Sequence, residues 1–248
     1  MACRFNTVGF CHPEEHYVLA AKERLPHVKA LVRQGAYFWL HGPRQTGKTT
    51  AMRQWATTLT QRSKYAAIVV SVNSLDPSSE QTNLLEEESF LHDLREAART
   101  LPEELQPPDW GYQVGGQRIR SALTHWAESC PRPLVLFFDD IDTLEARSLT
   151  CFLRQLLSGA QERPERFPQS IAFMGRQDIN CLPVEAELNT PGSLFHQLRT
   201  STIALQPFSL EEVANVYQKH TDATGQLFTL EAVDRAFELT QGQPWLVN

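Results

Sequence analysis

Short apolar runs alternate with longer helical patterns over the first 207 residues. Five runs rich in β-branched, aliphatic and aromatic residues have the length of buried strands: 36–41, 67–72, 134–138, 170–174 and 202–205. Four segments between them have helical composition: 49–61, 89–100, 117–129 and 148–157. Strands that alternate with helices predict an α/β fold, with a parallel sheet covered by helices on both faces.

The pattern changes at both ends of this alternation. Residues 14–34 predict a helix with a break at Pro26, closed by Gly35. After Pro207 only helical patterns follow, beginning with a Ser-Leu-Glu-Glu capping box at 209–212 and continuing in a second helix over 229–241. We therefore expect three parts: an N-terminal helical segment (1–35), an α/β core (36–207) and a small, incomplete helical subdomain (208–248).

Two polar segments interrupt the core. Residues 76–88 are acidic and predict a surface insertion, and 101–116, with three prolines and three glycines, predicts a loop. The chain of 248 residues is 42% hydrophobic, enough for a buried core, and its net charge of −6 gives no general attraction to nucleic acid. Five scattered cysteines without a Cys-x-x-Cys pair argue against a zinc site and favour reduced thiols, and no signal peptide or membrane span is visible. We expect a cytoplasmic protein.

A phosphate-binding motif lies between the first strand and the helix that follows it. The residues are Gly42, Pro43, Arg44, Gln45, Thr46, Gly47, Lys48 and Thr49, which match G-x-x-x-x-G-K-[ST] in full. In this motif the backbone N–H groups surround the phosphates, and the helix N-terminus favours negative charge. Lys48 is expected to bridge the β- and γ-phosphates, Thr49 to bind Mg²⁺ and Thr50 to lie near the α-phosphate. The motif predicts ATP and Mg²⁺ binding.

Acidic residues follow the apolar run at 134–138. Asp139 comes directly after it, where a Walker B carboxylate binds Mg²⁺, and is expected to do so through water. Asp140 occupies the position at which many ATPases have a glutamate that polarises the attacking water. Aspartate is shorter by one methylene, so turnover is expected to be slower. Asp142 is expected to cap the next helix or to fix the loop.

These motifs resemble those of STAND-type and archaeal-type AAA-like ATPases. The resemblance rests on 39–49, on the Phe-Phe-Asp-Asp-Ile-Asp run at 137–142, on the lid entry at 208–212 and on Gly-Gln-Pro at 242–244. The start of the chain, at 5–9 and 16–17, is similar to bacterial AAA-like ATP-binding proteins of unassigned role. It implies an additional-strand P-loop NTPase with sheet order 5-1-4-3-2, followed by a helical lid. The run at 170–174 would then be the sensor strand, between the two Walker strands.

The resemblance also implies roles for three residues outside the Walker motifs. Arg176 lies at the tip of the sensor strand, where the family has Asn, Thr or Ser, and either contacts the γ-phosphate or pairs with Asp178 or Asp140. Arg199 is either an arginine finger, reaching a neighbouring subunit in a homo-oligomer, or part of a surface salt bridge. Pro244 either packs against adenine or marks the start of a helix. The N-terminal segment around 16–17 is expected to cover the adenine.

Several functions remain open from the sequence. The first is an ATP-hydrolysing conformational switch, with catalytic roles for Lys48, Asp140, Arg176 and Arg199 and an unidentified protein partner. The second is a nucleotide-binding scaffold with little or no hydrolysis. A phosphotransferase is disfavoured because an arginine-rich lid is missing. A DNA-associated ATPase subunit would need a DNA-binding domain that these 248 residues do not contain.

Overall fold

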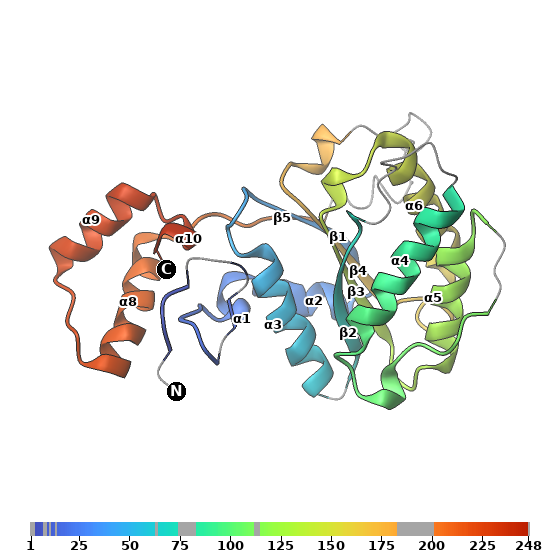
Figure 1. Cartoon of the computed structure of the whole chain (residues 1–248), viewed down its shortest axis with the longest axis horizontal. Coiled ribbons are helices and arrows are strands. Elements are labelled where there is room, and N and C mark those ends of the chain that lie inside the picture. Colours follow the sequence, from blue (N-terminus) through green and yellow to red (C-terminus); the bar gives the residue numbers. More distant parts are fainter. Residues whose placement is uncertain are drawn as a thin grey trace.

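In the computed structural model, five strands form one parallel sheet in the order β2–β3–β4–β1–β5 (Figure 1). They are β1 (Tyr37–His41), β2 (Ala66–Ser71), β3 (Leu134–Asp139), β4 (Ser170–Gly175) and β5 (Thr202–Ala204). Read from the other edge the order is 5-1-4-3-2, which confirms the predicted P-loop NTPase topology. The carboxyl ends of β1, β3 and β4 therefore lie together at one edge of the sheet, where ligands bind in open α/β folds.

The structure describes residues 3–6, 9, 11–12, 14–62, 64–73, 83–111, 115–182 and 201–247, with the backbone only for 83–86. Its helices are α1 (Ala21–Arg24), α2 (Val28–Arg33), α3 (Lys48–Gln61), α4 (Asn83–Ala98), α5 (Arg118–Ser129), α6 (Ala146–Gly159), α8 (Leu210–Thr224), α9 (Leu230–Thr240) and α10 (Pro244–Val247). Short 3₁₀ turns are η2 (Glu103–Leu105), η3 (Ile141–Thr143), η4 (Ala160–Glu162) and η5 (Ile179–Cys181). None of the described helices is long and apolar enough to span a membrane.

Strands β1 to β4 each divide their side chains between two cores. Phe138 is fully buried in a core that the sheet shares with α4, α5 and α6, and its neighbour Phe137 is fully buried on the opposite face, against α1, α2 and α3. Successive side chains of a strand point to opposite faces, so a strand covered on both faces must be apolar throughout. This explains why the strands appear in the sequence as continuous apolar runs.

A third core joins the N-terminal segment to the helices after residue 207. Tyr17 and Leu19 pack with Phe208, Val213 and other apolar residues of α8–α10. Figure 1 shows this segment running between α8 and α3. The expected helix over 14–34 is wrong before residue 21, because 17–20 have no helical structure and bury positions 17 and 19 with a period of two. The break at Pro26 is confirmed, since α1 and α2 end and begin on either side of it.

The acidic segment before α4 differs from the expectation as well. Helix α4 begins at Asn83, so the last residues of the expected surface insertion are helical, and residues 76–82 lie outside the described part. Glu87 is buried, with 5% of its surface exposed. Its carboxylate accepts hydrogen bonds from Gln155 Nε2 at 2.6 Å and from the backbone N–H of Gly116 at 3.0 Å. These partners compensate for the burial of an acidic side chain, which composition alone assigns to the surface.

Candidate nucleotide-binding site

The P-loop connects β1 to α3, and each of its two glycines is needed for a different reason. A Cβ at Gly42 would overlap the carbonyl oxygen of Leu205, so the close approach of these two backbones requires glycine. Gly47 has φ of 88°, in the left-handed region that favours glycine. Inside the loop, Thr46 is fully buried and its hydroxyl donates to the carbonyl of Pro43 at 2.9 Å. The loop is thus closed on itself before α3 begins at Lys48.

Lys48 is folded back onto this loop. Its Nζ donates to the carbonyl oxygens of Gly42 at 2.6 Å and Pro43 at 2.8 Å. Burial lowers the pKa of Lys48, while Asp139 and the two nearby aspartates act in the opposite direction. Two carbonyl oxygens therefore hold the ammonium group beside the loop. Phosphate oxygens can replace them as hydrogen-bond acceptors.

Asp139, at the end of β3, contacts the first turn of α3. The hydroxyl of Thr49 donates to Asp139 Oδ2, and the carboxylate is only 7% exposed. Burial raises the pKa of Asp139, which the hydrogen bond from Thr49 opposes. A hydroxyl and a carboxylate are oxygen ligands of the kind Mg²⁺ prefers. Within the described ranges no group of three or more His, Cys, Asp and Glu side chains could hold a metal, so phosphates and water would supply the other ligands.

Asp140 has a left-handed backbone, with φ of 61°, and its side chain turns towards β2. Its Oδ2 lies 3.2 Å from the hydroxyl of Ser71 and 3.4 Å from Nδ2 of Asn73, and both groups are placed to donate to it. Ser71 is opposite Asp139 in the β2–β3 register, so the sheet itself brings these donors to the carboxylate. Asp140 is thereby oriented by two polar residues that sequence reasoning did not identify.

Arg176 follows β4 and pairs with Asp142. Both its backbone N–H, at 2.9 Å, and its Nε, at 3.0 Å, donate to Asp142 Oδ2. The Asp142 side chain is 4% exposed and that of Arg176 is 42% exposed. Of the two sequence-based alternatives, this supports pairing, but with Asp142 instead of Asp178 or Asp140. Asp142 therefore holds the first residue after β4, a contact between two loops that was not expected, and the N-cap of α6 is Glu145 and not Asp142.

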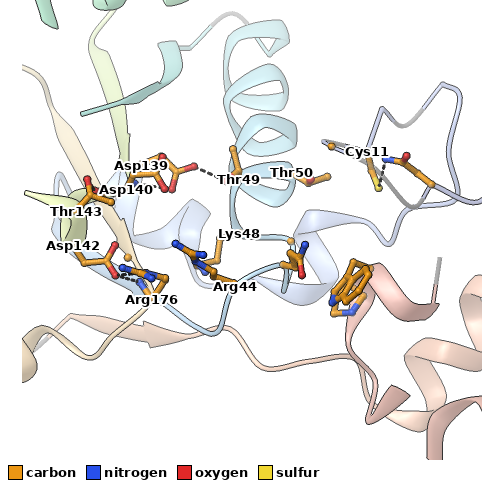
Figure 2. A pocket seen from close by; sticks show the side chains of 17 residues that line it. Cys11, Arg44, Lys48, Thr49, Thr50, Asp139, Asp140, Asp142, Thr143 and Arg176 are labelled. Carbon is orange, nitrogen blue, oxygen red and sulfur yellow. Dashed lines mark hydrogen bonds and ion pairs between the residues drawn. The ribbon is translucent and has the colours of Figure 1, made fainter. Parts of the chain in front are cut away.

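These groups meet in one cavity of about 350 Å³ at the carboxyl edge of the sheet (Figure 2). The sequence-predicted residues that line it are Arg44, Gln45, Gly47, Lys48, Thr49, Thr50, Asp139, Asp140, Arg176 and Pro244. In Figure 2, dashed lines join Arg176 to Asp142 and Thr49 to Asp139, and Lys48 and Arg44 lie between these two pairs and the N-terminal segment. Gly42, Pro43 and Thr46 shape the loop without lining the cavity. Arg199 lies outside the described residues.

Comparison with known proteins agrees with this arrangement. The family model described as the AAA ATPase domain matches residues 23–168, more than half of the chain. This chain belongs to the AAA ATPase domain family. A search of curated protein sequences found no match. The matched range of the AAA ATPase domain contains both Walker motifs and ends before β4.

Solved structures resemble this AAA ATPase domain in fold. The Walker-type ATPase paby2304 of Pyrococcus abyssi has a TM-score of 0.70 at 13% identity, covering 98% of this chain and 69% of that one. Cdc6p from Pyrobaculum aerophilum has a TM-score of 0.59 at 14% identity, covering 91% and 60%. AMPPCP-bound DnaA from Aquifex aeolicus has a TM-score of 0.56 at 13% identity, covering 94% and 61%. The chain thus spans about two-thirds of the length of these structures.

One end of the cavity comes from residues that were not expected to line the site. Asn6, Gly9 and Cys11 line it together with Trp245, the residue after Pro244. Asn6 donates to Cys11 Sγ at 3.5 Å. His16 and Tyr17, expected to cover the adenine, are buried instead, and Tyr17 packs in the third core, with its hydroxyl 3.1 Å from Nδ1 of His220. The sequence signal for this end of the cavity was an aromatic residue, Trp245, directly after the predicted Pro244.

Proposed function

We propose that this AAA ATPase domain binds ATP with Mg²⁺ in the cavity and hydrolyses it, acting as a nucleotide-driven conformational switch of the STAND type. The observation that carries the proposal is that Lys48 and the Thr49–Asp139 pair share one cavity with Asp140. Phosphate binding needs the first two features, and hydrolysis needs a positioned base as well. A cavity for binding alone has no need for a carboxylate oriented by Ser71 and Asn73.

Each residue then has a distinct task. Lys48 exchanges its loop carbonyls for β- and γ-phosphate oxygens, and the N–H groups at the start of α3 face the same phosphates. Thr49 and Asp139 would hold Mg²⁺, which would supply positive charge beside the phosphates. Asp140 orients the attacking water and accepts its proton. Arg176, once it is released from Asp142, would contact the γ-phosphate.

The opposite end of the cavity is proposed to hold the base. Pro244 begins α10 and Trp245 is 42% exposed beside it, so an adenine ring would have an aromatic surface to stack on. The residues come from the helical subdomain, whereas the phosphate-binding residues come from the core. ATP would therefore contact both parts, and loss of the γ-phosphate would change their relative angle. In an oligomer, Arg199 would act on the nucleotide of a neighbouring subunit.

A specific observation also supports a second candidate, a scaffold that binds nucleotide and hydrolyses it poorly. Asp140 is one methylene shorter than the usual glutamate, and Arg176 is held by the buried Asp142. In such a scaffold, the shorter Asp140 and the paired Arg176 would not reach the γ-phosphate and its attacking water closely enough for efficient hydrolysis.

Radiolabelled ATP separates these functions. We expect the purified protein with Mg²⁺ to bind ATP and release phosphate, and Lys48→Ala to lose both, since the ammonium contacts the phosphates directly. Arg62→Ala, at the other end of α3, is a matched control that should behave as the wild type. Binding without phosphate release above that of Lys48→Ala would reject hydrolysis and favour the scaffold. Absence of nucleotide binding by the wild type would reject both.

A further inference from the structure

Arg24, the last residue of α1, is a buried cation behind the P-loop. Its side chain is 7% exposed and lies over the ring of Phe208, 4.6 Å from the ring centroid. The guanidinium donates to the carbonyl of Thr46 at 3.0 Å, to the carbonyl of Gln206 at 2.6 Å and to Glu212 Oε1 at 2.9 Å. The three acceptors belong to the P-loop, to the connection after β5 and to α8. A single side chain thus joins the phosphate-binding loop to the helical subdomain.

The backbone that carries Arg24 is fixed to the core. The N–H of Ala21 donates to Oε1 of Gln54 on α3 at 2.9 Å, and Nε2 of Gln54 lies 3.5 Å from the carbonyl of Leu19. Because α3 also carries Lys48 and Thr49, α1 and the P-loop form one unit. Any movement of α8 relative to the core must therefore stretch or break the contact between Arg24 and Glu212.

The bond to Thr46 also determines which way a P-loop peptide points. In a trans peptide the C=O and the following N–H are antiparallel. Arg24 holds the carbonyl of Thr46, so the N–H of Gly47 points away from the guanidinium, and Gly47 lines the nucleotide cavity. P-loops bind phosphates through such inward N–H groups. Arg24 therefore keeps a phosphate donor in place from the opposite side of the loop.

A second contact acts on the loop in the same way. Nε2 of Gln243, just before α10, donates to the carbonyl of Arg44 at 2.6 Å. By the same antiparallel geometry this orients the N–H of Gln45, which also lines the cavity. Gln243 belongs to the helical subdomain, so the P-loop is held from outside by α8 through Arg24 and by the turn before α10 directly.

Glu212 is suited to transmit this contact. Its Oε2 accepts the backbone N–H of Ser209 at 2.9 Å in the capping box of α8, while Oε1 accepts from Arg24. The same carboxylate therefore completes the first turn of α8 and anchors that turn to Arg24. A shift of the guanidinium would move the Glu212 carboxylate and so weaken the capping box at the N-terminus of α8.

We propose that Arg24 is a positioning residue that orients the P-loop for phosphate binding and couples this loop to α8 through Glu212. The proposal rests on the proposed binding of ATP in the cavity. Phosphate entering the loop pulls on the Thr46–Gly47 peptide, and Arg24 transmits the change to the start of α8. The coupling needs no contact between Arg24 and the nucleotide.

The first test is the affinity for ADP and ATP of Arg24→Gln, measured by calorimetry. We expect both dissociation constants to rise by about tenfold, as for the loss of a charged hydrogen bond, because the Gly47 N–H serves the phosphates that the two nucleotides share. The KM for ATP should rise similarly and kcat should change less. Lys22→Gln, an exposed residue of the same helix, is the matched control and should bind like the wild type. In Arg24→Lys the single ammonium nitrogen cannot reach all three acceptors at once. Its dissociation constants should therefore be intermediate between those of Arg24→Gln and the wild type.

The second test separates the two arms of the contact. In Glu212→Gln the hydrogen bond from Arg24 to the carbonyl of Thr46 remains. The ADP affinity should therefore stay within about twofold of the wild type, because the lost Arg24–Glu212 ion pair is partly exposed and contributes little. Hydrogen exchange at the first turn of α8 should slow on ADP addition in the wild type and lose this response in both Glu212→Gln and Arg24→Gln. A merely structural role would change exchange equally with and without ADP.

Two results would overturn the proposal. One is an unchanged nucleotide affinity in Arg24→Gln and Arg24→Lys. The other is a full ADP response of α8 in Glu212→Gln. If the wild type binds ADP, either result rejects the role proposed for Arg24 and leaves the proposed function standing. If the wild type binds no nucleotide, the proposed function itself is rejected. If Arg24→Gln does not fold, Arg24→Lys and Glu212→Gln still decide between these outcomes.

Discussion

The two ends of the nucleotide cavity are built in different ways. At the phosphate end, one continuous loop between β1 and α3 meets the carboxyl ends of β3 and β4. Both of these strands are buried at every position, and their register with β1 determines where these elements lie. At the opposite end, Asn6, Gly9 and Cys11 face Pro244 and Trp245, which are more than 200 residues away in the sequence. The phosphate end is supported by the sheet, and the other end depends on how the helical subdomain docks.

This difference indicates that the two ends have different functions, catalysis at the phosphate end and ligand sensing at the other. Groups at strand ends have well-defined positions because each strand is hydrogen-bonded to its neighbours. Catalysis requires reacting groups in such well-defined positions. Groups carried by a docked subdomain move when it moves, which suits a part that senses the ligand. The subdomain also exposes large apolar side chains, with Leu227 and Leu230 each 82% exposed, whereas β3 and β4 are buried throughout. We therefore expect substitutions at the two ends to affect different steps.

The largest effect is expected at the phosphate end, for Asp140→Asn. The amide cannot accept a proton from water, so kcat for ATP should fall by about 100-fold or more while the affinity for ATP stays close to that of the wild type. Phosphate release and ATP binding are to be measured on the same preparation. Glu145→Gln, an exposed carboxylate at the start of α6, is the control. Equal turnover in the two variants would show that Asp140 is not the base.

A smaller effect is expected at the other end, for Trp245→Ala. Loss of a stacking surface should weaken ADP binding by about tenfold. Pyrophosphate has no base, so its affinity should not change, whereas Lys48→Ala should lose both ligands. Competition binding of ADP and pyrophosphate measures this directly. If pyrophosphate binding weakens as much as ADP binding, Trp245 acts on the loop and the division between the two ends is wrong.

The smallest effect is expected for Arg176→Ala. Asp142 keeps its bond from the backbone N–H of Arg176 but loses the guanidinium, so the free energy of unfolding should fall by about 1 kcal/mol, a modest cost because the arginine is half exposed. Urea denaturation without nucleotide measures it. Arg147→Ala, an exposed arginine on α6, should leave stability unchanged. Unchanged stability would show that the guanidinium does not support Asp142, whatever Arg176 contributes to turnover through its proposed contact with the γ-phosphate.

Much of the phosphate end could be predicted because its signals are local. The P-loop follows a strand within a few residues, and Asp139 ends an apolar run, so motif and context appear together in the sequence. Long-range partners gave no such signal. Ser71 and Asn73 follow β2 without a motif, and Arg24 is one of many arginines until its contacts with Thr46 and Glu212 are seen. The N-terminal segment was misjudged because the helical composition of 14–20 was overridden by packing against α8–α10.

The sequence by itself determined the sheet, the P-loop and the two Walker carboxylates. Short continuous apolar runs are typical of strands covered on both faces, and the glycine at 47 is required by the local backbone because its φ is positive. Only the tertiary structure decided that Arg176 pairs with Asp142, that Trp245 faces the N-terminal segment across the cavity and that Arg24 joins the P-loop to α8. These contacts join segments distant in the sequence, and only the packing of the three cores brings them within hydrogen-bonding distance.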